Sequence, residues 1–340
     1  MLQEYIEGFI NDQKIPGVVI HVQRDLDVLL KQNYGNFTAR DGSTQSIMQQ
    51  TIFDIASLTK VVATLPSVLL LLARGEIVLE DSVQKFLPNF LHETVTIKNL
   101  LQHNSGLQAD LSPPVQRDEI RNILEEIYLL KLSYATGENI VYSDLGMILL
   151  GKIIEEVSGK SLNSFANKEI FKPWNMQHTT FNPSKYLLHN IASTELVNGQ
   201  YVQGEVHDEK AFLLEGVSGS AGLFSCVEDL VKYAQYWLGI SKQSIIPSEW
   251  LDLCHAHLFQ HRGLGFEVWT GQNPVLSCGR RWTVGSFGHT GFTGTSIWMD
   301  PKRKLFVVLL TNAVHYGRHF HMKEFRQGVH DLVYEMYISN

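Results

Sequence analysis

Cysteine is scarce in this sequence, with 3 cysteines among 340 residues. They are Cys226, Cys254 and Cys278, so their number is odd and none belongs to a C-x-x-C pair. A disulfide framework or a cysteine-rich metal site needs cysteines that pair at suitable spacing. We therefore expect reduced cysteines with structural roles. Nothing in the sequence places a base near Cys226, so we do not expect that thiol to be a nucleophile.

Positive charge is also in short supply. The chain has 28 Lys and Arg residues against 35 Asp and Glu residues, which gives a formal net charge of -7. The basic residues are scattered, whereas a nucleic-acid surface gathers them on one face. We therefore expect no nucleic-acid partner.

Cofactor motifs are missing as well. The sequence has no G-x-G-x-x-G after an expected strand, no Walker sequence and no H-E-x-x-H pattern. Two groups of histidines have spacings that suit a metal, but they lack matching carboxylates: His255, His257 and His261, and His315, His319 and His321. We expect no metal and no organic cofactor.

Long hydrophobic runs are absent too. The longest apolar stretch, Val61–Ala73, is too short to span a bilayer and contains Thr64, Pro66 and Ser67. The N-terminus carries early acidic residues and no basic region followed by an apolar run. We expect no integral membrane segment and a cytoplasmic protein, unless an export signal has been removed.

The hydrophobic content of 44% is enough for a large core. Periodicity predicts a helix over 2–14, strands over 18–23 and 28–34, further strands over 296–299 and 305–310, and a final helix over about 323–337. The middle favours helices over 60–75, 96–103, 118–130, 144–158, 161–170 and 228–239, whereas 180–215 is polar and turn-rich and predicts a loop over the site. These patterns predict an α+β fold in one domain, 1–340. Both chain ends (about 1–55 and 262–340) form one antiparallel sheet flanked by helices, and a mainly helical region is inserted at about 56–261.

Ser57 and Lys60 form the first group that can do chemistry. They lie three residues apart at the start of an apolar helix, so both side chains share one helix face. A serine hydroxyl needs a neighbouring base, and a lysine serves as one when its pKa is lowered, or supports another base when it is charged. The motif alone is weak, because a capping serine beside a solvated lysine gives the same letters.

Tyr142 and Asp144 form a second group, in the sequence Tyr-Ser-Asp before an expected helix. A lysine ammonium nearby lowers the pKa of a tyrosine, so we expect a lowered pKa for Tyr142 if it faces Lys60. The phenol would then carry the proton of Ser57 to the leaving group. Asp144 would position Lys60 or accept a hydrogen bond from substrate, although a buried tyrosine before a helix cap is an ordinary structural feature.

His289, Thr290 and Gly291 form the third group, and Phe292 follows them. They fall where an edge strand is expected, and a glycine there admits a close backbone approach by substrate. The N–H groups of Ser57 and Phe292 would form an oxyanion hole, and His289 and Thr290 would offer donors to a substrate carboxylate or carbonyl. A glycine-containing turn with a surface histidine is the ordinary alternative.

The order S-x-x-K, Y-x-N/D and K/H-T-G resembles the signature of serine β-lactamases and penicillin-recognising enzymes. The likeness is to the branch of class C β-lactamases, D-alanyl-D-alanine carboxypeptidases and β-lactamase-like esterases. Leu100–Leu107 resembles that branch's L-L-x-H-x-S-G-L, and Gly216–Asp229 resembles its glycine-rich segment. The resemblance covers about residues 5 to 335. It implies an acyl-enzyme mechanism with Ser57 as nucleophile and Lys60 and Tyr142 as a coupled proton-transfer pair.

Two departures from the family pattern bear on activity. Asp144 stands where classical β-lactamases usually have asparagine, and its charge favours the ammonium form of Lys60, so Tyr142 becomes the preferred base. His289 stands where they usually have lysine, and a neutral imidazole attracts a substrate carboxylate less strongly. Both departures argue against an efficient β-lactamase.

The sequence leaves several functions open. The expected partner is a small-molecule or short-peptide substrate: an ester, a D-amino-acid peptide or a peptidoglycan-derived fragment. The segment Gly216–Asp229, preceded by Val206–Glu209, resembles the same part of relatives that hydrolyse amides in the cytoplasm, and it also occurs in esterase-like members. A true β-lactamase and a non-catalytic binding or scaffold protein that retains the fold are the alternatives. The sequence does not predict an oligomeric state.

Overall fold

One seven-stranded antiparallel sheet organises the molecule. The computed structural model describes residues 1–241, 244–318 and 322–338. The strand order is β3-β2-β1-β12-β11-β10-β9. The strands are β1 (Gly17–Arg24), β2 (Asp27–Thr38), β3 (Thr44–Ser46), β9 (Glu267–Val268), β10 (Phe287–Thr290), β11 (Ser296–Asp300) and β12 (Leu305–Thr311).

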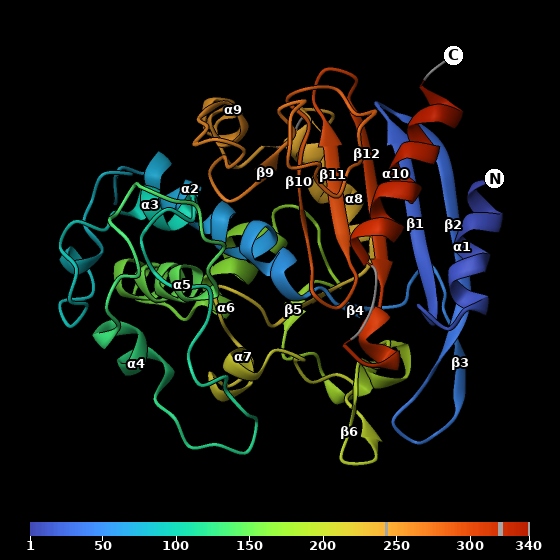
Figure 1. Cartoon of the computed structure of the whole chain (residues 1–340), viewed down its shortest axis with the longest axis horizontal. Coiled ribbons are helices and arrows are strands. Elements are labelled where there is room, and N and C mark those ends of the chain that lie inside the picture. Colours follow the sequence, from blue (N-terminus) through green and yellow to red (C-terminus); the bar gives the residue numbers. More distant parts are fainter. Residues whose placement is uncertain (242–243, 319–321, 339–340) are drawn as a thin grey trace.

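The two ends of the chain meet in the middle of this sheet. β1 pairs with β12 in antiparallel register from Val18 opposite Thr311 to Arg24 opposite Leu305. The N- and C-termini therefore lie near each other on one side of the molecule (Figure 1). The prediction of one sheet built from both chain ends is confirmed.

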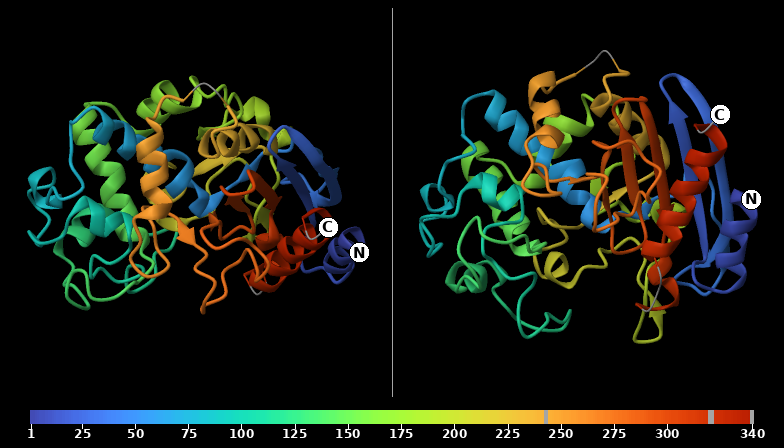
Figure 2. Two further views of the ribbon diagram at one scale, coloured as in Figure 1. Left: turned by 90° about the horizontal axis from the view of Figure 1, so that it is seen from above. Right: turned by 45° about the horizontal axis from the view of Figure 1, so that its top comes forward.

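Helices cover both faces of the sheet. α1 (Leu2–Asn11) and α10 (Met322–Tyr337) lie on one face, and α8 (Val227–Trp237) lies on the other (Figure 2). Alternate side chains of a strand point to opposite faces, so β1 contributes Val18, Ile20 and Val22 to the core beneath α1 and α10. Val19 joins the larger core on the opposite face, which continues into the helical region.

The helical region packs beside the sheet and contains the expected helices, several of them shorter than predicted. The elements are η1 (Ala56–Leu58), the π-helix η2 (Lys60–Thr64), α2 (Leu65–Ala73), η3 (Val83–Lys85), α3 (Ile97–Leu101), α4 (Ile123–Leu129), α5 (Asp144–Ser158), α6 (Leu162–Ala166), the π-helix η4 (Asn167–Phe171) and α9 (Ser248–Ala256). The helical run Ala56–Ala73 is 18 residues long, and its length and composition would suit a membrane span. Because 89% of it is buried inside the molecule, it is the core helix of this region.

The segment 180–215 is not a plain loop. It contains β5 (Thr180–Phe181), η5 (Lys185–Asn190), β6 (Leu196–Val197), β7 (Gln200–Tyr201) and α7 (Glu209–Leu213). β5 joins β8 (Leu223–Ser225) and β4 (Phe53–Asp54) in a small sheet of three strands. Elements this short leave no hydrophobic period in the sequence. Because β4 directly precedes Ser57, this small sheet ties the segment to the candidate site.

Candidate active site

The backbone that carries Ser57 is held in a strained conformation. Ala56, the residue before it, has φ of 46°, a left-handed value that is unfavourable for a residue with a Cβ. The buried carboxylate of Asp54 fixes this turn: Oδ1 accepts a hydrogen bond from the Ala56 N–H at 2.8 Å, and Oδ2 accepts one from the His207 N–H at 2.7 Å. The segment around His207 therefore helps to set the position of Ser57.

Lys60 lies directly behind Ser57, as the spacing of the two residues predicts. Its Nζ donates to Ser57 Oγ at 2.8 Å and to the backbone oxygen of Ser220 at 2.8 Å. Asp144 Oδ1 lies 2.8 Å from the same nitrogen. These acceptors match the three N–H bonds of an ammonium group. Only 1% of the Lys60 side chain is exposed, so this charge is held almost entirely by its protein partners.

The charge state of Lys60 follows from two opposed effects. Burial lowers the pKa of its ammonium, but the negative charge of Asp144 and the Tyr142 hydroxyl raise it, and the net pKa is above the ordinary lysine value. The sequence-based expectation that Asp144 favours the ammonium form is confirmed. Lys60 is therefore a hydrogen-bond donor to Ser57 in the resting site, not a free base.

Tyr142 behaves differently from the expectation. Its ring lies 5.1 Å from Lys60 Nζ, and hydrogen bonds to Lys60 and Ser57 favour the phenolate. Burial nevertheless dominates, the Asp144 carboxylate adds to it, and the net pKa of Tyr142 is raised. The prediction of a lowered pKa was wrong, because it counted the lysine and not the desolvation of the phenolate. At neutral pH, Lys60 and Tyr142 both hold their protons.

Two buried histidines flank Tyr142, with ring centroids at 4.8 Å for His103 and 5.8 Å for His289. Burial, with nearby positive charges, lowers the pKa of both imidazoles well below the usual value, so both are neutral. His103 Nδ1 accepts from the Ser143 N–H at 3.1 Å, whereas His289 Nδ1 donates to the Thr290 oxygen at 2.8 Å. Sequence reasoning did not single out His103, although the Leu100–Leu107 motif contains it.

The end of β10 lies against the turn that carries Ser57. Thr293 Oγ1 donates to the Asp54 oxygen at 2.7 Å, and Thr295 Oγ1 donates to the Ile55 oxygen at 3.1 Å. Gly291 sits between them so tightly that a Cβ there would meet the Ile55 oxygen at 2.4 Å. Glycine is therefore required at this position by close packing. β9 pairs with β10 only at Phe287 and Gly288. The next two residues of β10, His289 and Thr290, therefore pair with β11 on one side and line the cavity on the other.

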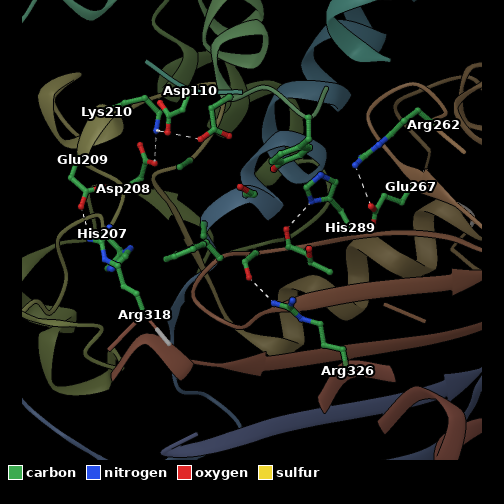
Figure 3. A pocket seen from close by; sticks show the side chains of 18 residues that line it. Asp110, His207, Asp208, Glu209, Lys210, Arg262, Glu267, His289, Arg318 and Arg326 are labelled. Atoms are coloured by element: carbon green, nitrogen blue, oxygen red, sulfur yellow. Dashed lines mark hydrogen bonds and ion pairs between the residues drawn. The ribbon is translucent and has the colours of Figure 1, made fainter. Parts of the chain in front are cut away.

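A cavity of about 440 Å³ is lined by Ser57, Tyr142, Asp144, His289, Thr290 and Gly291, and by the exposed side chain of Phe292. The Phe292 ring stacks on His207 with centroids 5.8 Å apart. A second cavity of about 630 Å³ lies beside the first. The two share a wall of polar side chains, which are labelled in Figure 3: Asp110, His207, Glu209, Lys210 and Arg318. The roles of the Ser57 and Phe292 N–H groups as oxyanion donors stay a prediction.

Two arginines in the cavity wall were not found by sequence reasoning (Figure 3). Arg326 is 7% exposed and donates to the Gly291 and Thr295 oxygens at 2.7 and 3.0 Å, and burial lowers its pKa to about 10. Arg262 lies over the Tyr142 ring, 5.3 Å from its centroid, and pairs with Glu267 at 3.1 Å. Within the described ranges, Arg262 Nε and Nη1 and Arg326 Nε have no hydrogen-bond partner. No local motif marks these residues, because the fold brings them in from 120 and 184 positions beyond Tyr142 along the chain.

Lys210 was also missed. It comes from α7, and its Nζ lies 2.8 Å from Asp110, 3.3 Å from Asp144 and 3.3 Å from Asp208. Asp144 thus bridges two ammonium groups, those of Lys60 and Lys210. The segment 180–215, expected as a loop over the site, does reach it through this helix.

The histidine groups noted in the sequence have structural surroundings. His255 stacks on Phe287 with centroids 4.5 Å apart, and His315 accepts a hydrogen bond from the Thr38 N–H at 3.3 Å. His319 and His321 lie outside the described residues. Among the residues that the structure describes, no group of three or more His, Cys, Asp or Glu side chains could hold a metal ion.

Comparisons with known proteins identify the family and the fold. A family model described as Beta-lactamase matches residues 2–330. The chain is 31% identical to the "N-acetylmuramyl-L-alanine amidase" of Bacillus subtilis (strain 168), over 88% of this chain and 78% of the relative. It is 29% identical to the "Putative D-alanyl-D-alanine carboxypeptidase" of Escherichia coli (strain K12), over 89% of this chain and 80% of the relative. The fold matches a solved class C β-lactamase with a TM-score of 0.78 at 21% identity, over 100% of this chain and 96% of that one.

Proposed function

The chain belongs to the β-lactamase family and is a serine hydrolase, and we propose that it hydrolyses an amide bond in a carboxylate-bearing peptide derived from the bacterial cell wall. The observation that carries the proposal is the hydrogen bond of 2.8 Å between Lys60 and Ser57 at the wall of a cavity that also contains two incompletely paired arginines. The first feature supports acyl transfer. The second feature supports the substrate class.

In the acylation step, Ser57 Oγ attacks the carbonyl carbon of the scissile amide. The proton of Ser57 passes to the Lys60–Tyr142 pair once the pair has lost one proton, and the pair returns it to the nitrogen of the leaving amine. The carbonyl oxygen takes up negative charge between the N–H groups of Ser57 and Phe292. The carbon–nitrogen bond breaks, and Ser57 is left as an ester.

In the deacylation step, a water molecule attacks the Ser57 ester. The same pair accepts a proton from the water and gives one back to Ser57 Oγ, so the free acid leaves and the resting site is restored. Asp144 holds Lys60 throughout, because the ammonium is almost completely buried and this carboxylate is the charged group paired with it. This chemistry uses only side chains and backbone N–H groups of the chain.

Arg262 and Arg326 support a substrate with a carboxylate near the scissile bond. Both guanidinium groups line the cavity, and a guanidinium in partly dehydrated surroundings binds a carboxylate strongly. His289 is neutral and supplies no such charge. In classical β-lactamases, a lysine at the position of His289 would attract the substrate carboxylate. In this chain, Arg262 and Arg326 would supply that attraction.

The second cavity supports a substrate that extends beyond the reactive group. Its wall is formed largely by charged and polar side chains, and five of its residues also line the first cavity. A peptide or sugar with many hydrogen-bonding groups fits such surroundings better than the acyl chain of a simple ester. The relatives named as an amidase of N-acetylmuramyl-L-alanine and as a D-alanyl-D-alanine carboxypeptidase point to the same class of substrate.

The experiment compares five substrates on one enzyme preparation, with products identified by liquid chromatography and mass spectrometry. They are an N-acetylmuramyl peptide, a peptide ending in D-alanyl-D-alanine, the methyl ester of each carboxylate, and a p-nitrophenyl ester. We expect release of a free amine from at least one of the two carboxylate peptides, with lower kcat/KM for its methyl ester. Turnover of the p-nitrophenyl ester without cleavage of either peptide would contradict the proposed substrate class.

A further inference from the structure

Lys210 is a second buried lysine beside the proposed nucleophile, and the mechanism above does not use it. Only 5% of its side chain is exposed. Its Nζ lies 3.3 Å from Asp144 Oδ2, whereas Lys60 contacts the other oxygen of this carboxylate, Oδ1. The same carboxylate is therefore shared between the lysine that contacts Ser57 and a lysine that does not.

Lys210 carries a permanent positive charge. Burial lowers the pKa of its ammonium, but the carboxylates of Asp208, Asp144 and Asp110 outweigh burial and raise the pKa far above the ordinary value. Asp208 is fixed in place because its Oδ1 accepts the Ala211 N–H at 2.8 Å. Lys210 is thus locked at the junction of the two cavities, and it stays charged wherever the enzyme is folded.

We propose that Lys210 is a positioning residue that offsets the negative charge of Asp144 and so lets the Lys60–Tyr142 pair release a proton at a lower pH than it would beside Asp144 alone. The inference rests on the proposed acyl-enzyme function of Ser57. In this arrangement, the positive charge of Lys210 reduces the negative potential that Asp144 exerts on Lys60. Asp144 alone would act as a full negative charge.

The direction of the effect does not depend on which member of the pair is the base. Without Lys210, the charge of Asp144 would stabilise the ammonium of Lys60 and destabilise the phenolate of Tyr142. Both changes make the pair hold its protons more tightly. The charged and titratable groups that act on Lys60 come from several elements: Asp144, Asp208, Tyr142, His103 and His289. Arg262 lies over the ring of the other member of the pair, Tyr142. Neither imidazole is charged in its buried position, so neither replaces the charge that Lys210 supplies.

The test is the pH dependence of kcat/KM for a p-nitrophenyl ester in Lys210→Met and Lys210→Arg. We expect Lys210→Met to move the rising limb of the profile to higher pH by about one unit, which is about a tenfold loss at neutral pH. Lys210→Arg keeps the charge and should keep the limb near the wild-type position. The double variant Asp144→Asn/Lys210→Met removes both charges, so its limb should return to the wild-type position or below it.

Two controls make the result specific. Lys152→Met removes a lysine on α5, the helix that begins at Asp144, where Lys152 pairs with Glu155 and Glu156 at 3.4 and 3.1 Å outside the cavity. This variant should leave the limb unmoved. Lys210→Gln tests the same loss of charge with hydrogen-bond donors retained, in case Lys210→Met does not fold.

A second readout does not depend on turnover. The near-ultraviolet absorbance of tyrosinate, taken as the difference between each protein and its Tyr142→Phe variant, follows the ionisation of Tyr142 directly. A folded Lys210→Met or Lys210→Gln whose limb and tyrosinate titration match the wild type would overturn the inference. Equal shifts for Lys210→Arg and Lys210→Met would also overturn it. If the wild type fails to hydrolyse the ester, the proposed function is in doubt, and the titration still decides the role of Lys210.

Discussion

The ammonium of Lys60 and the carboxylate of Asp144 form a largely buried ion pair, with 2.8 Å between Nζ and Oδ1, and 1% of the lysine and 19% of the aspartate side chain are exposed. The pair fixes Lys60 beside Ser57 and raises the pKa of its ammonium. The same carboxylate contributes to the raised pKa of Tyr142. A residue at the start of α5 therefore sets the proton affinity of the whole site.

The wild-type enzyme should be more active at alkaline pH. The competent form has lost one proton from the Lys60–Tyr142 pair, and the pKa values of both groups are raised, so this form increases as pH rises above neutrality. We expect kcat/KM for a p-nitrophenyl ester to climb steadily from neutral pH into the alkaline range. A profile that falls with rising pH over this range would contradict the assignment of charges.

Asp144→Asn should move that profile to lower pH. The substitution keeps the size of the side chain and removes the negative charge beside Lys60 and Tyr142, so the pair loses its proton more easily. We expect a shift of about one pH unit in the rising limb. Asp12→Asn, far along the chain at the end of α1 and 61% exposed, is a matched control that should leave the profile unchanged. An unmoved limb in a folded Asp144→Asn protein would show that this carboxylate does not control the pair.

Gly291→Ala should reduce activity through backbone displacement. A methyl group at this position would meet the Ile55 oxygen at 2.4 Å and Thr295 Oγ1 at 2.1 Å, so the end of β10 must move away from the turn before Ser57. We expect a fall of about a hundredfold in kcat/KM, the usual cost of misplacing a reacting group by about 1 Å. Stopped-flow acylation with the chromogenic ester measures the effect.

Gly8→Ala in α1 is the control for Gly291→Ala. A Cβ at this glycine meets nothing within 4 Å, and alanine favours a helix over glycine by about 0.5–1 kcal/mol. Activity should be unchanged, and the melting temperature should rise slightly. Normal kcat/KM in Gly291→Ala would mean that the contact between β10 and the Ser57 turn has no bearing on catalysis.

Arg262→Met should weaken the binding of carboxylate substrates selectively. Loss of a charged hydrogen-bond donor costs about 1.5–3 kcal/mol, so KM for a carboxylate peptide should rise about tenfold to a hundredfold. KM for its methyl ester should change much less, and Arg262→Lys should retain part of the preference. Equal losses for the acid and the ester would indicate that Arg262 supports the fold of the cavity and does not bind the carboxylate.

The sequence was sufficient to predict the strands of the sheet and the contact between Ser57 and Lys60. In β1, Val18, Ile20 and Val22 point to one face of the sheet, and the residues between them point to the other. This repeat of two residues is visible in the sequence because the strand is long and buried. Ser57 and Lys60 lie three residues apart on one helical turn, so their contact follows from local geometry. These features depend on neighbours in the chain.

The rest of the site depends on contacts between distant segments. Lys210 meets Asp144 across 66 positions, and Arg326 reaches Gly291 from the last helix, and neither carries a local pattern that marks it. The raised pKa of Tyr142 also depends on distant segments, because the burial that causes it requires several of them to pack around the phenol. A sequence shows which groups titrate, but desolvation is a property of the folded protein.

The most direct test of the account is whether Ser57 becomes acylated. Wild-type protein and Ser57→Ala are incubated with an active-serine fluorophosphonate, with penicillin and with a p-nitrophenyl ester, and intact mass spectrometry followed by peptide mapping locates any adduct. The account predicts a covalent adduct on the peptide that contains Ser57 and none in Ser57→Ala of equal thermal stability. An adduct on another residue, or no adduct from any of the three reagents on folded wild-type protein, would contradict the acyl-enzyme mechanism and favour a binding protein that retains the fold.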